Sequence, residues 1–134
     1  MSEIIQVHSQ KREEWIDITQ NVQKVIDGCH VLKGAALLFV PHTTAAITIN
    51  ENADPDVRED INRFLNALVP KNGHYRHLEG NADAHIKSTL VGVSLTIPIE
   101  NGKLLLGTWQ GIYFCEFDGP RLRQVYLQVL PNTA

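Results

Sequence analysis

The sequence predicts an α+β fold in one domain, residues 1–134, with about three helices and seven or eight short strands arranged as a β-sandwich. Three observations support this prediction. Short apolar segments separated by turn residues recur along the chain, one segment carries strong helix-start and helix-stop signals, and the last third contains only strand patterns. The length is ordinary for one domain, and the 43% apolar content can supply a core.

Four short strands are expected in the first fifty residues. Each is a run of alternating or continuous apolar residues bounded by polar residues or by proline. They are expected at residues 4–7, 15–18, 35–40 and 46–50. Between the second and third strands, apolar residues at helical spacing predict a helix over residues 20–27, which Thr19 caps and Gly28 ends.

The clearest helix signal begins at Asp54, a good N-cap, followed by Pro55 at the first helical position, where a missing N–H costs nothing. Apolar residues then recur on one face until Pro70 ends the helix. A shorter helix is expected to begin at Asn81 and to run to about Leu90.

Strand patterns fill the rest of the chain. The Asn101-Gly102 pair is a strong hairpin signal, because both central residues of a type I′ turn need a positive φ. Pro98 lacks an N–H, so its strand is expected to lie near a sheet edge there. The strands are expected at residues 93–99, 103–106, 112–117 and 124–130, with a turn at 118–120.

The charge balance and the N-terminus exclude several classes of partner. Lys and Arg total 12 against 15 Asp and Glu, whereas proteins that bind nucleic-acid phosphates usually carry a basic excess. The first residues do not resemble a signal peptide, and the longest apolar run, Ala35 to Val40, is far too short to span a bilayer. We therefore expect a cytoplasmic protein that binds neither nucleic acid nor membrane.

The densest polar cluster contains His77, Glu79, Asn81 and His85 within nine residues. Imidazole and carboxylate are the usual ligands of zinc and its neighbours. The start of the helix at Asn81 also offers unpaired N–H groups that favour an anion. A polar surface loop followed by a helix cap explains the same residues without any ligand.

A second cluster, His42-Thr43-Thr44, follows the buried strand 35–40, and Glu51 follows the next strand. Polar residues directly after a buried strand stand on a rigid support. His42 can supply a third nitrogen ligand, and Glu51 can act as an oxygen ligand or a general base. A hairpin turn capped by His42 is the simpler alternative.

A third segment, Gly107 to Gly111, carries Trp109 and Gln110. Glycines within a strand pattern mark a bulge or a close approach by a ligand. Trp109 offers a flat apolar face for a ligand, although core packing explains a tryptophan equally simply. Arg121 and Arg123 follow the 118–120 turn and either bind phosphate or pair with acidic neighbours.

Together these motifs resemble the YjbQ family over almost the whole chain. The matching runs are His42-Thr43-Thr44 with Glu51-Asn52, His77-Leu78-Glu79-Gly80-Asn81 with His85, Gly107-Thr108-Trp109-Gln110, and Glu116-Phe117-Asp118-Gly119-Pro120-Arg121. The resemblance implies a seven-stranded antiparallel or mixed β-sandwich with two to three helices, assembled as a homotrimer. It also implies a relation to proteins labelled secondary thiamine-phosphate synthases.

We therefore expect a metal- or anion-binding enzyme that acts on a small, phosphorylated molecule. The ligand types favour Zn²⁺ over Mg²⁺, which prefers oxygen ligands. A transferase resembling thiamine-phosphate synthase and a metal-assisted hydrolase of a phosphate or acyl compound both fit, and a non-catalytic metabolite- or metal-binding trimer is the alternative. The expected roles are metal ligands for His42, His77 and His85; catalysis for Glu51, Glu79 and Asn81; and ligand binding for Thr43, Thr44, Asn81, Trp109, Gln110 and Arg121.

Overall fold

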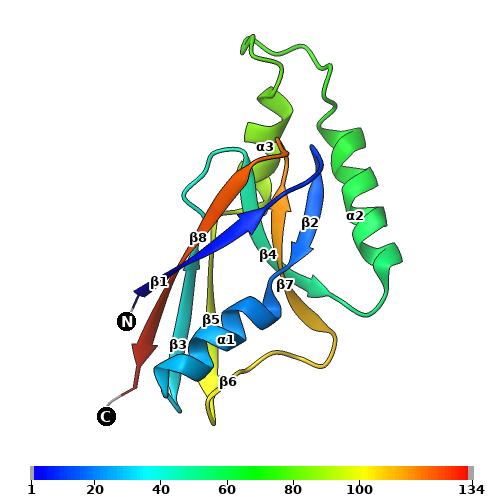
Figure 1. Ribbon diagram of the computed structural model, residues 1–134. Coiled ribbons are helices and arrows are strands. Elements are labelled where there is room, and N and C mark those ends of the chain that lie inside the picture. Colours follow the sequence, from blue (N-terminus) through cyan, green and yellow to red (C-terminus); the bar gives the residue numbers. More distant parts are fainter. Residues whose placement is uncertain (1, 133–134) are drawn as a thin grey trace.

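The computed structural model describes residues 2–132 as two β-sheets and three helices (Figure 1). The helices are α1 (Thr19–Cys29), α2 (Pro55–Leu68) and α3 (Ala82–Val91). The strands are β1 (Ser2–His8), β2 (Glu14–Asp17), β3 (Gly34–Phe39), β4 (Ala45–Glu51), β5 (Ser94–Glu100), β6 (Lys103–Leu104), β7 (Gln110–Glu116) and β8 (Leu122–Pro131).

The strands divide into a five-stranded sheet, in the order β1-β8-β3-β5-β6, and a three-stranded sheet, in the order β2-β7-β4. Every strand pair in the described chain is antiparallel. The α+β prediction is confirmed, but the seven-stranded count and the mixed alternative are corrected to eight antiparallel strands. The eight strands correspond to the eight ranges expected from the sequence patterns, and the count of seven came from the resemblance. The strand expected at residues 103–106 is shorter than predicted, since β6 has two residues that pair with Ile99 and Glu100.

Two hydrophobic cores hold the layers together. The larger core lies between the inner face of the five-stranded sheet, helix α1 and one face of the three-stranded sheet. The smaller core includes Tyr113, Cys115 and Phe117, with Ala84 of α3 and Leu65 of α2 on the other side. Strand β7 is therefore buried on both faces, which explains its continuous apolar sequence.

The helix boundaries follow the local signals. The Asp54 carboxylate accepts a hydrogen bond from the Asp56 backbone N–H at 2.9 Å, and Pro55 begins α2 as predicted. At α1, Asp17 rather than Thr19 accepts the first backbone N–H, because the Thr19 hydroxyl accepts from the Ile112 backbone N–H at 2.8 Å. Helix α1 also continues past Gly28 to Cys29.

The predicted hairpin between β5 and β6 is present. Asn101 and Gly102 have φ values of 51° and 75°, as a type I′ turn requires. Pro98 pairs with Ala35 of β3 on one side, whereas β6 pairs with β5 only beyond Pro98. The proline therefore lies where its strand has almost no second neighbour, as expected.

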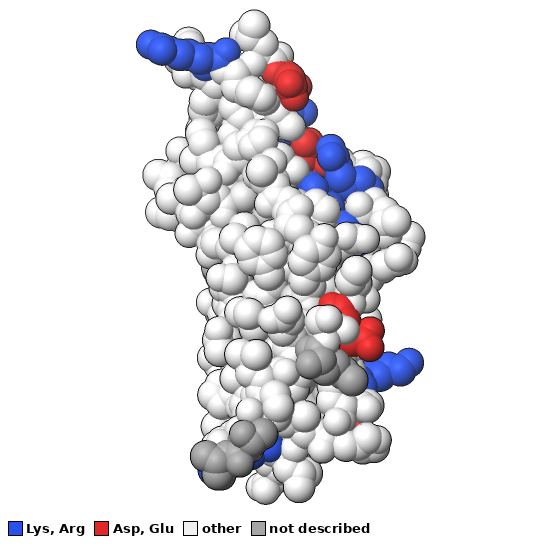
Figure 2. All heavy atoms as spheres, turned by 90° about the vertical axis from the view of Figure 1, so that its left-hand side faces the viewer, with Lys and Arg blue, Asp and Glu red and all other residues white. Residues whose placement is uncertain are grey.

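The outer face of the five-stranded sheet carries apolar side chains. Ile4, Tyr126 and Phe39 occupy paired positions on three adjacent strands, and the rings of Phe39 and Tyr126 stack at 6.4 Å. Figure 2 shows few charged side chains across the middle of this side of the molecule. Separately, none of the helices in residues 2–132 is long and apolar enough to span a membrane.

Candidate functional site

The loop 40–44 and helix α3 meet because backbone hydrogen bonds fasten both to the same place. The Val40 N–H donates to the Val93 carbonyl at 2.8 Å, and the Ile47 N–H donates to the Gly92 carbonyl at 3.0 Å. The end of β3, the start of β4 and the end of α3 are thereby held side by side, at the end of the molecule that carries α3 (Figure 1). Polar side chains from segments far apart in the sequence converge there.

His42 is fixed by β8. Its Nε2 accepts a hydrogen bond from the Gln124 backbone N–H at 3.0 Å, so the neutral ring carries its proton on Nδ1. Partial burial, and then the positive charge of Arg123, lower the pKa of His42 below its ordinary value of 6.5. His42 is therefore neutral at pH 7, and only Nδ1 remains for another partner.

His85 lies between two cavities and joins the other two predicted histidines. With His42, Thr43, Ser88 and Thr89 it lines a cavity of about 470 Å³. On its other side, His85 and His77 line a cavity of about 440 Å³, and their rings meet edge to face at 5.2 Å. His85 therefore shares one cavity with His42 and another with His77, and we call these three residues the row of histidines.

The row of histidines does not by itself form a closed metal site. His77 Nε2 lies 3.8 Å from a carboxylate oxygen of Glu79, and both side chains are well exposed. Across residues 2–132 no three His, Cys, Asp or Glu side chains are grouped closely enough to hold a metal ion. Of the three predicted metal ligands, the structure brings the rings of His77 and His85 into contact.

Arg121 and Thr43 line a third cavity, of about 500 Å³, on the other side of His42. Arg121 is half exposed, and its guanidinium Nη2 lies 3.2 Å from the Asp118 carboxylate. The Asn81 amide donates to the same carboxylate oxygen at 2.8 Å, while the Asn81 Oδ1 is buried and has no hydrogen-bond partner within residues 2–132. Asn81 therefore connects the start of α3 to Arg121 through Asp118.

Arg123 and Glu116 form a buried ion pair below this cavity. Arg123 Nε donates to a Glu116 oxygen at 2.9 Å, and Nη2 donates to the Thr44 hydroxyl at 2.9 Å. Both charged side chains are almost fully buried. Arg123 therefore pairs with an acidic neighbour and is supported by Thr44, whereas phosphate binding stays a prediction for the half-exposed Arg121.

Glu51, Trp109 and Gln110 lie away from the histidines. Glu51 pairs with Gln110 at the far end of β4, and β4 from Ala45 to Glu51 spans about 20 Å. Trp109 is 62% exposed, so the core-packing alternative for this residue is wrong. In one chain these three residues form a separate surface at the opposite end of the three-stranded sheet.

Some cavity residues were not expected from the sequence. Ser88 and Thr89 line the His42–His85 cavity, and their positions three and four residues after His85 place them on the same helical face. That spacing is a usable signal. By contrast, the Gln124 backbone N–H has no local sequence signal, because its role depends on the register of β8.

The fold and these cavities define an α+β sandwich protein with a histidine-lined cleft between a strand-end loop and a helix. A family model described as UPF0047 protein YjbQ-like matches residues 3–132, and the chain belongs to this family. UPF0047 protein MJ1081 of Methanocaldococcus jannaschii is 58% identical over 93% of this chain and 91% of its own length. YugU of Bacillus subtilis is 51% identical over 97% and 99%.

A crystal structure from Clostridium acetobutylicum, described as an uncharacterized conserved protein of the YjbQ/UPF0047 family, has the same fold. It superimposes with a TM-score of 0.93 at 54% identity, and the match covers 96% of this chain and 99% of that one. The family assignment predicted from the motifs is therefore confirmed.

Proposed function

We propose that this protein is an enzyme that binds a divalent metal and a small phosphorylated molecule in the cleft around His42, His77 and His85. The observation that carries the proposal is the position of His85. It lines one cavity with His42 and another with His77, although the three histidines come from different segments. Imidazoles gathered in a solvent-open cleft favour a transition metal such as Zn²⁺ over Mg²⁺.

His77 and His85 are the residues that would hold the metal, because their rings are already in contact. Glu79 is the nearest carboxylate to His77. His42, a predicted metal ligand, would instead act as a hydrogen-bond donor through its Nδ1–H, because its Nε2 accepts from the Gln124 N–H. The bound metal would supply Lewis-acid polarisation of a phosphate oxygen.

The phosphate group is expected on the Arg121 side of His42. Thr43 can donate a hydroxyl there, and the half-exposed Arg121 guanidinium can donate in a fork geometry suited to phosphate. Asn81 holds the Asp118 carboxylate that orients Arg121, so we propose a positioning role for Asn81. Glu79 remains the candidate proton acceptor.

Two reactions fit this arrangement. In a transferase of the thiamine-phosphate synthase type, the arginine side of the cleft would hold the diphosphate as it leaves. In a hydrolase of a phosphate or acyl compound, Glu79 would orient the attacking water. The cavities of about 440 to 500 Å³ have the size of small-molecule sites.

We also propose that the protein assembles as a homotrimer. The apolar row Ile4, Tyr126 and Phe39 on the outer face of the five-stranded sheet supports self-association, because exposed apolar patches of this kind mark protein contacts. In an assembly, the surface formed by Glu51, Trp109 and Gln110 could reach the histidine row of a neighbouring copy.

A second candidate function is binding without turnover. It is favoured by the position of Glu51, a predicted catalytic residue that lies at the far end of β4, about 20 Å from the start of the strand. Within one chain, Glu79 is then the nearest glutamate to the row of histidines. The same cleft would then store or carry a phosphorylated metabolite.

Calorimetric titration with Zn²⁺ and then with inorganic diphosphate tests the proposal. We expect Arg121→Ala to weaken diphosphate binding about tenfold without changing Zn²⁺ binding, because one charge-assisted contact is lost. Lys33→Ala, which removes an exposed cation just before β3, is the control. Equal diphosphate affinity in both variants would contradict the Arg121 site.

Turnover of phosphorylated compounds distinguishes the two candidates. Glu79→Gln should abolish turnover while leaving diphosphate affinity unchanged if the protein is an enzyme. Saturable binding with no turnover in the wild-type protein would instead establish the binding function.

A further inference from the structure

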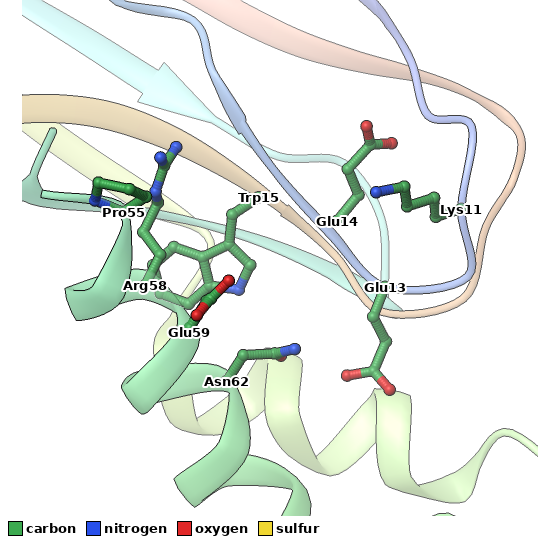
Figure 3. A pocket seen from close by; sticks show the side chains of 8 residues that line it. All are labelled: Lys11, Glu13, Glu14, Trp15, Pro55, Arg58, Glu59 and Asn62. Carbon is green, nitrogen blue, oxygen red and sulfur yellow. The ribbon is translucent and has the colours of Figure 1, made fainter.

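A further cavity, of about 340 Å³, lies between strand β2 and the first two turns of α2 (Figure 3). Its walls are Lys11, Glu13, Glu14 and Trp15 on one side and Pro55, Arg58, Glu59 and Asn62 on the other. Its volume is at the lower end of the range of small-molecule sites. None of the residues proposed above for the histidine cleft lines it.

The cavity exists because α2 does not pack closely on the sheet at this end. No residue of α2 is buried, and the four α2 residues in the cavity wall lie on one polar face at i, i+3, i+4 and i+7. The helix contacts the sheet there through Arg58, whose guanidinium carbon lies 5.1 Å from the centre of the Tyr113 ring.

Two polar atoms of complementary kind are left without partners at this cavity. Trp15 Nε1 is a donor and Asn62 Oδ1 is an acceptor, and both are buried without a hydrogen bond in the described chain. Figure 3 shows the Asn62 side chain close to the nitrogen edge of the indole. Buried polar groups are nearly always satisfied, so a matched donor and acceptor left over in one cavity indicate a missing partner.

The surrounding side chains are already fixed. The Glu14 carboxylate accepts from the Gln10 backbone N–H at 2.8 Å, and Glu13 lies 3.2 Å from Nζ of the buried Lys87. The Trp15 ring packs on Tyr113 with their centres 5.9 Å apart. These contacts hold Glu13, Glu14 and the Trp15 ring in place. Because Trp15 Nε1 and Asn62 Oδ1 are both buried, binding would require the Asn62 side chain to turn aside and uncover them.

We propose that this cavity is a second ligand site, for a small planar molecule that presents a hydrogen-bond acceptor beside an N–H donor. Such an edge is found in amides and amino-substituted nitrogen heterocycles. The acceptor takes the Trp15 indole N–H, and the donor is accepted by Asn62 Oδ1. The proposal goes beyond the histidine cleft and does not depend on it.

Indole resonances in a ¹H–¹⁵N correlation spectrum test the proposal, because the chain has only two tryptophans. Cytosine, whose N3 acceptor lies beside an amino donor, is the probe, and Trp109→Phe assigns the Trp15 signal. We expect cytosine to shift the Trp15 indole signal downfield with saturation and to leave the Trp109 signal unmoved. Pyridine, which has an acceptor but no donor, should bind at least tenfold more weakly.

Two variants remove one partner each. Asn62→Leu removes the acceptor at similar volume, and Trp15→Phe removes the donor while keeping an aromatic ring, so each should weaken cytosine binding about tenfold. Phe64→Ala, an exposed position on the same helix, should bind as the wild type does. Thermal unfolding reports whether each of the three variants folds.

The proposal would be overturned by an unmoved Trp15 signal up to the solubility limit of cytosine. Equal binding by Asn62→Leu and wild type would also overturn it. So would a crystal structure grown in cytosine in which an ordered water alone bridges Trp15 and Asn62.

Discussion

Glu116→Gln should strongly destabilise the protein, because Glu116 is the buried carboxylate on which four segments depend. It accepts from the Ser9 hydroxyl at 2.6 Å, from the Asp118 N–H at 3.0 Å and from Arg123 Nε at 2.9 Å, while Arg123 also binds Thr44. Glutamine has the same shape but no charge. The substitution therefore leaves the Arg123 cation buried without an anion.

Removing one partner of a buried ion pair costs about 3–5 kcal/mol. For a chain of this length, 1 kcal/mol corresponds to about 4 °C in melting temperature, so Tm should fall by roughly 12–20 °C. The double variant Glu116→Gln/Arg123→Met removes both charges and should recover much of this loss.

The pH dependence of stability tests the role of Glu116 independently. Burial opposes ionisation of Glu116, but the hydrogen bonds from Arg123, Ser9 and Asp118 outweigh it, so its pKa lies below the ordinary value of 4.5. A lowered carboxylate pKa stabilises the folded state above pH 4.5, and this stability is lost as the pH falls through the folded-state value. Glu116→Gln should therefore flatten the acid side of the stability profile.

Thermal unfolding followed by circular dichroism at pH 7 and pH 4, at equal protein concentrations, measures both effects. Asp60→Asn is the control, because it breaks an Arg63–Asp60 pair whose side chains are 77% and 71% exposed, and Tm should change little. A Glu116→Gln protein that melted within about 4 °C of the wild type, equivalent to about 1 kcal/mol, would refute the reasoning.

Two further predictions concern His42 and the glycines. Because the pKa of His42 is lowered in the folded state, the unfolded chain binds more protons as the pH falls through 6.5, and the free energy of unfolding should decrease from pH 7.5 to pH 5. In urea titrations, His42→Gln should reduce that decrease, and an unchanged decrease would contradict the lowered pKa of His42. Gly102→Ala places a side chain at φ 75° and should lower the free energy of unfolding by about 1–2 kcal/mol. Gly28→Ala, in α1 with open space around it, should raise it by about 0.5–1 kcal/mol. Thermal melts that shift in the same direction for both variants would contradict this account.

Local signals in the sequence predicted the elements whose ends are determined by neighbouring residues. Asp54 and Pro55 begin α2 as expected, and Asn101-Gly102 forms the β5–β6 hairpin. These features depend on backbone φ values and on capping groups within three residues, so they can be derived without tertiary structure.

The arrangement of the candidate site was only partly predictable. The spacing of His77 and His85 indicated a shared site, and their rings are in contact. However, His42 and Glu51 flank a single strand, β4, whose two ends are about 20 Å apart. The sequence distance of nine residues hides this separation because an extended chain advances over 3 Å per residue.

The buried pair Arg123 and Glu116 was the least predictable feature. Charged residues in a strand usually face water, and only the register of β8 against its neighbours places Arg123 over Glu116. The same register brings the Gln124 N–H to His42 and so determines the protonation of that ring. Tertiary pairing of this kind leaves no periodic signal in the sequence.

The metal content of purified protein loaded with Zn²⁺ and dialysed tests the central claim most directly, with His85→Ala compared against His8→Ala. His85 is the residue shared by two cavities, whereas His8 is exposed on β1. We predict about one metal ion per chain in the wild type and in His8→Ala, and loss of the metal in His85→Ala. Equal metal content in all three proteins, or none in any, would contradict a metal site at the histidine row.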